Sequence, residues 1–244
     1  MSTKNSTDKL KGAGRLKKGS EKIERAMKVG DEFDSVPAPF KRPLPFIIGL
    51  AGKAGCGKTT VAQAIDNVID ERNTLIRYSF AKPLKDMLLG GLGLVDKDTA
   101  AASIYGCDYR GIIQTLGTEW GRHLVHPDIW VIAAETYIAR RNLGRGPIDL
   151  VIIDDVRFEN EATWVREHGL LVHITGRKAT LTEEQAAHIS ENSVIVQAED
   201  LMVDNSMSDM SHLENTAEYI YLNARDGIDA TKLRGRVEPP ASKG

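Results

Sequence analysis

The chain has 244 residues, an apolar fraction of 41% and a formal charge of −2, which fits one large domain, alone or with appended segments. The near-neutral net charge does not indicate a protein that binds nucleic acid or a membrane surface through its overall charge. Two cysteines are too few for a disulfide framework, no apolar run reaches the ~18 residues of a membrane span, and no signal-peptide pattern is present, so a soluble cytoplasmic protein is predicted.

The first segment, residues 1–44, is predicted to be a disordered basic arm. It is rich in Lys, Ser, Gly and Asp and has few clustered apolar residues, so it cannot bury enough surface to offset chain entropy. Its basic first half leaves weak contact with nucleic acid open, beside the simpler interpretation as a solvated tail. At the other end, residues 226–244 are predicted to form a flexible tail.

Between these ends, strands and helices are predicted to alternate over residues 45–225. Short apolar runs indicate buried strands, and apolar residues at helical spacing indicate helices. Strands are expected at 45–52, 74–80, 149–156 and 170–177, and helices at 58–72, 82–93, 109–125, 128–143 and 159–169. This alternation predicts a three-layer α/β fold, with a parallel sheet covered by helices on both faces.

A glycine-rich stretch lies between the first predicted strand and the first predicted helix. Gly52, Gly57, Lys58 and Thr59 match the P-loop pattern GxxxxGK[ST]. In this pattern backbone N–H groups and the helix N-terminus surround an anion, the lysine reaches the β- and γ-phosphates, and the threonine hydroxyl ligates Mg²⁺. The pattern therefore predicts a nucleoside triphosphate site, although a P-loop alone does not name the reaction.

Charged residues cluster beside two other predicted strands. Asp154 and Asp155 end one strand and Arg157 follows, at the sheet edge that faces the ligand crevice in doubly wound folds. An acid there can hold Mg²⁺ through water or bind a substrate base, and the arginine can reach a phosphate; helix capping by Asp155 is the alternative. Lys82 and Lys85 oppose the dipole of their helix, which an anion bound between them would explain; a solvated helix end is the equally open alternative.

The helix predicted at 109–125 and the start of the next one carry side chains suited to a nucleotide. Two polar groups can bond a base edge, two indoles can stack on a base and two arginines can bind a phosphate: Gln114 and Thr118, Trp120 and Trp130, Arg110 and Arg122. A core position is the alternative for Trp130. Further on, Arg177 ends the last predicted strand and Lys178 follows it, where P-loop kinases place a mobile lid with cations for the transition state. Such a lid is expected here at about 176–190, and a solvated loop is the alternative.

Five blocks of the sequence resemble, in this order, the deoxynucleoside monophosphate kinases of tailed bacteriophages. They are GLAGKAGCGKTT, FAKPLKDML, RGIIQTLGTEWGR…HPDIWV, DDVRFENEA and GR…HISE, and the resemblance runs from about residue 46 to 222. It implies a P-loop NTP hydrolase-type fold of the nucleoside monophosphate kinase kind. The activity it implies is transfer of the γ-phosphoryl of ATP, with Mg²⁺, to a deoxynucleoside 5′-monophosphate, giving the diphosphate for phage DNA synthesis in the host cytoplasm.

The resemblance also implies roles for individual residues. The ATP site would comprise Gly52, Ala54, Gly55, Gly57, Lys58, Thr59 and Thr60, with Thr59 and Asp155 at the metal. The acceptor site would comprise Lys85, Arg110, Gln114, Gly117, Thr118, Trp130, Asp155, Arg157, Glu161 and Glu191. The catalytic residues would be Lys58, Arg157 and Arg177, acting by direct in-line transfer without a covalent intermediate; His188 and Glu191 form the family's H-x-x-E segment.

Two departures from the family limit what is carried over. The arm before residue 46 has no counterpart in compact members, and the stretch between Leu89 and Tyr109 is short where some members carry a substrate-contacting insert, so base specificity is not inherited. Two alternatives stay open: another small-molecule P-loop kinase, acting on dephospho-coenzyme A or a nucleoside, and a non-kinase P-loop ATPase that acts with DNA through a partner. No membrane partner or stable nucleic-acid partner is expected, and a homodimer is left open.

Overall fold

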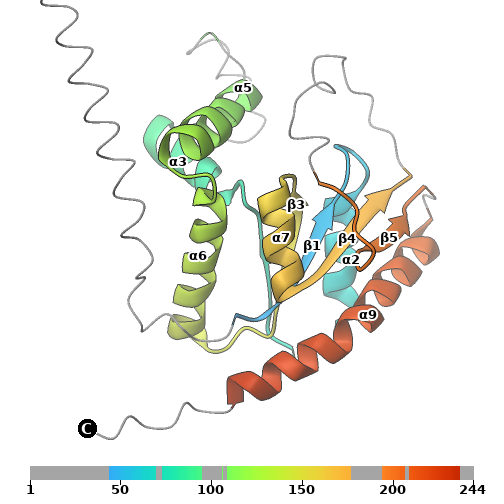
Figure 1. Cartoon of the computed structure of the whole chain (residues 1–244). Coiled ribbons are helices and arrows are strands. Elements are labelled where there is room, and N and C mark those ends of the chain that lie inside the picture. Colours follow the sequence, from blue (N-terminus) through green and yellow to red (C-terminus); the bar gives the residue numbers. More distant parts are fainter. Residues whose placement is uncertain are drawn as a thin grey trace, which may run out of the picture. The chain divides into compact units, whose positions relative to one another are not determined.

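A parallel five-stranded sheet forms the centre of the part of the chain that the structure, a computed structural model, describes (Figure 1). That part comprises residues 44–69, 73–94, 106, 109–176, 194–206 and 209–236. The strand order is β2-β3-β1-β4-β5, and every pairing is parallel. The strands are β1 (Phe46–Ala51), β2 (Leu75–Tyr78), β3 (Leu150–Val156), β4 (Gly169–Thr175) and β5 (Leu201–Asp204).

The central strand β1 explains where a ligand crevice forms. Ile47 pairs with Val151 of β3 on one side and with Gly169 of β4 on the other. From β1 the chain crosses to the edge strand β2, whereas β4 and β5 lie on the opposite side, so the direction of strand addition reverses next to β1. In open parallel sheets such a reversal opens a crevice at the carboxyl ends of the strands.

Helices cover both faces of this sheet, which confirms the three-layer α/β prediction. The helices are α2 (Lys58–Val68), α3 (Lys82–Leu92), α5 (Tyr109–Gln114), the π-helix η3 (Thr115–Val125), α6 (Ile129–Arg145), α7 (Glu159–His168) and α9 (Met210–Arg236). In Figure 1, α2 and α9 lie on one side of the sheet, and α6 and α7 lie on the other. None of the helices in the described ranges is long and apolar enough to cross a bilayer.

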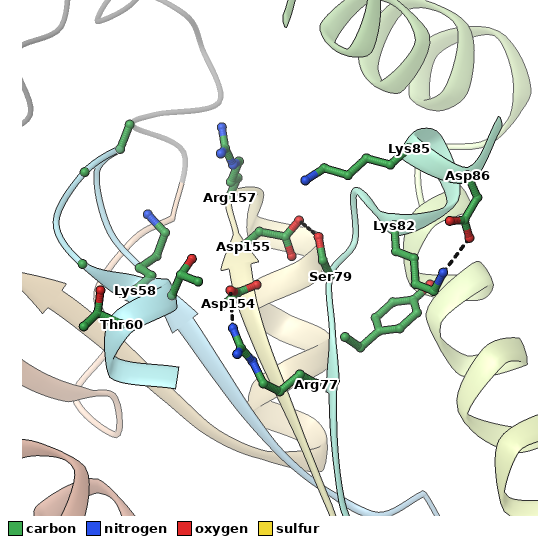
Figure 2. A pocket seen from close by; sticks show the side chains of 15 residues that line it. Lys58, Thr60, Arg77, Ser79, Lys82, Lys85, Asp86, Asp154, Asp155 and Arg157 are labelled. Atoms are coloured by element: carbon green, nitrogen blue, oxygen red, sulfur yellow. Dashed lines mark hydrogen bonds and ion pairs between the residues drawn. The ribbon is translucent and has the colours of Figure 1, made fainter. Parts of the chain in front are cut away.

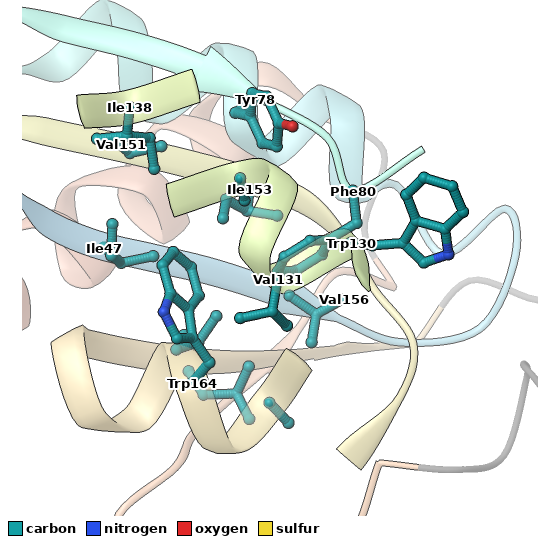
Figure 3. Close-up of a cluster of buried hydrophobic side chains, with 14 of the residues drawn as sticks. Ile47, Tyr78, Phe80, Trp130, Val131, Ile138, Val151, Ile153, Val156 and Trp164 are labelled. Atoms are coloured by element: carbon teal, nitrogen blue, oxygen red, sulfur yellow. The ribbon is translucent and has the colours of Figure 1, made fainter. Parts of the chain in front are cut away.

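Successive side chains of each strand point to opposite faces of the sheet and pack into two separate hydrophobic cores. On one face Ile47, Val151 and Ile153 pack against Trp130 and Trp164 (Figure 3). On the other face the buried strand residues Ile48, Leu50 and Ile152 pack against Val61, Ile65 and Ile220 of the helices α2 and α9. Because burying one such side chain contributes about 1.5–3 kcal/mol, these two layers hold the strand ends, and thus the crevice, in place.

The C-terminal part of the fold differs from the sequence prediction. The strand β5 and the helix α9 were not predicted, and α9 runs to Arg236, past the boundary expected at residue 225. A Cβ atom at Gly227 would lie 2.2 Å from Cε2 of Phe46, so the glycine permits close packing of α9 on β1. Ile228 is accordingly buried in the core beneath α9. Residues 1–43 of the predicted arm lie outside the described residues, as does the chain after residue 236, whereas Leu44 packs against one of the two cores.

The helix predicted at 109–125 is divided into two types of helix. An α-helical turn and a half, α5, leads into the π-helix η3, and at its end the N–H of His126 donates to the carbonyl of Gly121, five residues back. The hydrophobic periodicity indicates a helix but does not separate the two types. π-helical segments are rare overall, but those that occur lie frequently at functional sites. The residues of η3 are therefore candidates for a functional role.

Candidate active site

The loop between β1 and α2 has the geometry of an anion-binding loop. Gly57, immediately before α2, has φ +97°, a left-handed conformation that suits glycine. A Cβ atom at Gly57 would also lie 2.3 Å from Nδ2 of Asn205, which donates to the carbonyl of Cys56 at 2.9 Å. The loop is thus held against the end of β5, and the positive N-terminus of α2 faces the crevice.

Lys58 places an ammonium group across this loop. Its Nζ donates to the carbonyls of Gly52 at 2.6 Å and Lys53 at 2.9 Å. These contacts orient the positive charge toward the loop rather than into bulk solvent. Thr59 and Thr60 follow on the first turn of α2, and both line the adjacent cavity.

A cavity of about 1030 Å³ connects the loop with the ends of β2 and β3 and the start of α3 (Figure 2). It is lined by five cationic side chains and three carboxylates. The cations are Lys58, Arg77, Lys82, Lys85 and Arg157, and the acids are Asp86, Asp154 and Asp155. The excess of positive charge favours anionic ligands. Predicted site residues from three separate parts of the sequence meet here: Lys58, Lys85, and Asp155 with Arg157.

Asp155 anchors the start of α3. Its Oδ1 accepts the N–H of Phe80 at 2.8 Å, and its Oδ2 accepts the hydroxyl of Ser79 at 2.6 Å and the N–H of Ala81 at 2.9 Å. Both carboxylate oxygens are therefore engaged with the turn that begins α3. This turn carries Lys82, so Asp155 positions the cationic end of α3 at the cavity.

Asp154 faces the other side of the sheet, because successive side chains of a strand alternate. Its carboxylate forms an ion pair with Arg77 at 3.4 Å, and Arg77 donates to the side chain of Gln63 on α2 at 2.9 Å. Figure 2 shows Asp154 between Lys58 and Arg77, whereas Asp155 points toward Ser79. Asp154 is therefore the carboxylate on the P-loop side.

The oxygen atoms on the P-loop side suit Mg²⁺. The Thr59 hydroxyl and the Asp154 carboxylate both line the cavity, and Mg²⁺ takes one or two protein oxygens beside phosphate oxygens and water. Among the described residues there is no cluster of three or more His, Cys, Asp or Glu side chains that could hold a metal alone. The donor set thus fits a metal that arrives with a phosphate ligand.

The start of α3 provides the opposite wall. Lys82 pairs with Asp86 at 2.7 Å and lies over the ring of Tyr137, 5.9 Å from its centroid. Tyr137 in turn contacts the ring of Tyr78, and burial raises the pKa of the Tyr78 phenol, which keeps it neutral. Lys85 extends from α3 toward Arg157 across the cavity (Figure 2).

Several residues expected at the acceptor site do not line this cavity. Arg110, Gln114 and Thr118 are partly buried on α5 and η3 and are not among the residues that line the cavity. Trp130 is 3% exposed, in the core position that was its alternative, and its Nε1 donates to the carbonyl of Gly117 at 2.8 Å. An indole enclosed in this way does not present a face for stacking on a base.

Arg122 and Glu161 form a buried ion pair, with Nη2 and Oε1 2.5 Å apart. The phosphate role considered for Arg122 stays a prediction; in this structure its guanidinium is engaged by Glu161 inside the protein. Glu161 is 1% exposed, and burial raises its pKa to about 7, although Arg122 and two backbone N–H groups act in the opposite direction. Burial likewise lowers the pKa of Arg122, which the carboxylate of Glu161 partly offsets.

The remaining predicted residues lie outside the described residues. These are Arg177, Lys178, His188 and Glu191, together with nearly all of the expected lid at 176–190. Sequence reasoning missed Arg77 and Ser79 at the cavity. A usable signal existed, because both lie at the end of a predicted strand, where ligand-facing side chains of a parallel sheet collect.

Comparisons with known proteins agree with this geometry. The family model "Deoxynucleotide monophosphate kinase" matches residues 104–216. The "Deoxynucleoside-5'-monophosphate kinase" of Escherichia phage T5 is 28% identical, over 61% of this chain and 84% of that protein. The "Putative deoxynucleotide monophosphate kinase" of Acanthamoeba polyphaga mimivirus is 32% identical, over 50% of this chain and 69% of that protein.

Among solved structures, a gluconokinase from Sinorhizobium meliloti 1021 is similar at 14% identity with a TM-score of 0.36, over 81% of this chain and all of that one. The sequence relatives carry the assignment, since one is more than 30% identical over more than two thirds of its own length. The family resemblance predicted from the sequence blocks is confirmed, and the chain belongs to the deoxynucleotide monophosphate kinase family.

Proposed function

We propose that this chain is an ATP-dependent kinase that transfers the γ-phosphoryl group to a deoxynucleoside 5′-monophosphate and produces the diphosphate. The observation that carries the proposal is the cavity itself, in which a P-loop faces a second group of cations. Lys58 lies at the P-loop, Arg157 follows the end of β3, and Lys85 extends into the same cavity from α3 (Figure 2). A phosphotransferase needs a second anion site within reach of the first, and Lys85 and Arg157 can supply one.

The second cationic group has a clear physical purpose. Both the donor triphosphate and the acceptor monophosphate are anions, so their approach in water is repulsive. Lys85 and Arg157 would draw the acceptor phosphate toward the end of the triphosphate held by the P-loop amides and Lys58. The transferring group develops charge on its equatorial oxygens, which Arg157 can stabilise in an in-line displacement.

The metal site that we propose uses Thr59 and Asp154, in place of the expected pair Thr59 and Asp155. Asp154 lies on the P-loop side of β3, whereas the oxygens of Asp155 hold the start of α3. When bound with ATP, Mg²⁺ would neutralise charge on the β- and γ-phosphates. The role of Asp155 is then to place Lys82 and Lys85 for the acceptor.

The acceptor class comes from the relatives, whose names specify a deoxynucleoside or deoxynucleotide monophosphate. The test is to incubate the full chain with ATP, Mg²⁺ and one acceptor at a time, and to separate the products by chromatography. The panel contains the four deoxynucleoside monophosphates, their ribose counterparts and dephospho-coenzyme A. We expect a deoxynucleoside diphosphate from at least one deoxy acceptor; product only from dephospho-coenzyme A would contradict the proposal.

The variant Lys58→Ala tests the donor side of the same reaction. Loss of one preorganised charge at a transferring group typically lowers turnover by roughly 10²-fold or more. Arg140→Ala is the matched control, because it removes an exposed cation from α6. Near-normal transfer by a folded Lys58→Ala protein would contradict the assignment of the P-loop.

A further inference from the structure

Gly117, Trp130 and Glu161, which the family resemblance assigns to acceptor binding, have polar atoms that are hydrogen-bonded inside the protein. Trp130 and Glu161 are 3% and 1% exposed, and the carbonyl of Gly117 accepts the indole N–H of Trp130. None of the three is among the residues that line the cavity. A side chain whose polar atoms are already bonded in the core cannot contact a substrate without breaking those bonds.

Arg122 connects these residues. Its Nη1 donates to the carbonyl of Gly117 at 3.0 Å, and its Nη2 donates to Oε1 of Glu161 at 2.5 Å. The guanidinium also stacks on Phe158, with its central carbon 3.7 Å from the ring centroid. A guanidinium that is hydrogen-bonded through two nitrogens and stacked on an aromatic ring has little freedom to rotate.

The second oxygen of Glu161 reaches the loop between β3 and α7. Its Oε2 accepts the backbone N–H of Arg157 at 2.8 Å and that of Phe158 at 3.1 Å. These two residues connect β3 to α7, and the side chain of Arg157 lines the cavity. A continuous series of bonds therefore runs from the π-helix η3 through Arg122 and Glu161 to the backbone of Arg157.

We propose that Arg122 and Glu161 are positioning residues that orient Arg157 toward the transferring phosphate, and that neither contacts the acceptor. This inference rests on the proposed kinase function. It also gives η3 a purpose, because the helix carries both Arg122 and the Gly117 carbonyl that orients it. The acceptor roles of Gly117, Trp130 and Glu161 are then indirect.

Kinetics of Glu161→Gln and Arg122→Lys separate positioning from contact. A displacement of a catalytic group by about 1 Å can cost roughly 10²-fold in rate, so we expect kcat to fall by about that factor while the acceptor KM changes less than about threefold. Direct contact predicts the reverse, a raised acceptor KM with kcat preserved. That result, or unchanged kinetics in both variants, would overturn the proposal.

Two further variants guard against simple misfolding. The double variant Arg122→Gln with Glu161→Gln replaces the ion pair by neutral amides, and leaves no buried charge without a partner. We expect it to fold and still to show the kcat defect. Glu135→Gln is the matched control: its carboxylate accepts the indole N–H of Trp164 on α7 at 2.7 Å and has no part in the bonds that lead to Arg157. It should retain wild-type kcat.

Amide hydrogen exchange supplies a readout that does not depend on activity. In Glu161→Gln the amides of Arg157 and Phe158 lose a charged acceptor, and we expect them to exchange about 10- to 100-fold faster, with no such change in Glu135→Gln. Unchanged exchange at these two amides would overturn the positioning role. Absence of diphosphate from the wild-type protein would instead refute the kinase function, so the two failures are distinguishable.

Discussion

The neighbouring acids Asp154 and Asp155 should respond very differently to the same change, Asp→Asn. Asp155 uses both oxygens to accept three hydrogen bonds at the start of α3. An asparagine keeps one oxygen and directs an NH₂ group at donors, so at least one backbone N–H loses its acceptor. Because hydrogen bonds to a charged group contribute about 1.5–3 kcal/mol each, we expect Asp155→Asn to lose about 2–4 kcal/mol of unfolding free energy.

Asp154→Asn is the internal control on the same strand. Its carboxylate has one ion pair at 3.4 Å, with Arg77, whose side chain is 32% exposed. Pairs of this kind contribute about 0–1 kcal/mol. For a domain of this size, 1 kcal/mol shifts Tm by about 2–4 °C, so we expect losses of about 4–16 °C for Asp155→Asn and under about 4 °C for Asp154→Asn.

Thermal unfolding and a magnesium titration together test this division of roles. Asp154→Asn should keep its fold and require much more Mg²⁺ for half-maximal transfer, whereas Asp155→Asn should lose stability and keep the wild-type Mg²⁺ requirement. Equal stability losses, or a Mg²⁺ defect confined to Asp155→Asn, would refute the assignment of Asp154 to the metal side.

Two other predictions concern Glu161 and the P-loop. Burial raises the pKa of Glu161 from 4.5 to about 7, so between these pH values the folded protein binds more protons than the unfolded chain. The contribution of Glu161 to the free energy of unfolding should therefore fall as pH rises from 4.5 to about 7. Glu161→Gln should remove this pH dependence. Transfer should weaken below about pH 7, where the carboxylate is protonated, and a stability profile identical in Glu161→Gln would contradict this. Gly57→Ala should weaken nucleotide affinity by about tenfold or more in a fluorescent-ATP titration, because its φ is +97° and its Cβ would meet Asn205. Gly90→Ala, on open helix surface, should bind normally, and equal affinities would refute the reasoning.

The central part of the site could be predicted because simple rules bring its residues together. The P-loop pattern lies between a strand and a helix, and the carboxyl ends of parallel strands share one edge of the sheet. These two rules place Lys58, Asp155 and Arg157 near one another before any coordinates are known. Lys85 joins them because α3 begins immediately after β2.

Other features of the site and of the fold could not be predicted, because they depend on long-range packing that local sequence patterns do not contain. Which of two adjacent acids faces the P-loop follows from the register of β3, and a one-residue shift would exchange them. The burial of Trp130 and Glu161 depends on how η3, α6 and α7 pack, which the residue types alone do not reveal. The strand β5 has only four residues, and Gly227 interrupts the pattern of α9 where Phe46 packs against it.

The most direct test of the central claim follows the γ-phosphoryl group itself. The full chain would be given ATP labelled at the γ-phosphate, Mg²⁺ and a deoxynucleoside monophosphate, with and without DNA, alongside a protein that lacks residues 1–44. Our account predicts label in the deoxynucleoside diphosphate, independent of DNA and of the first 44 residues. Label found only in inorganic phosphate, at a rate that rises with DNA and collapses without the arm, would contradict it.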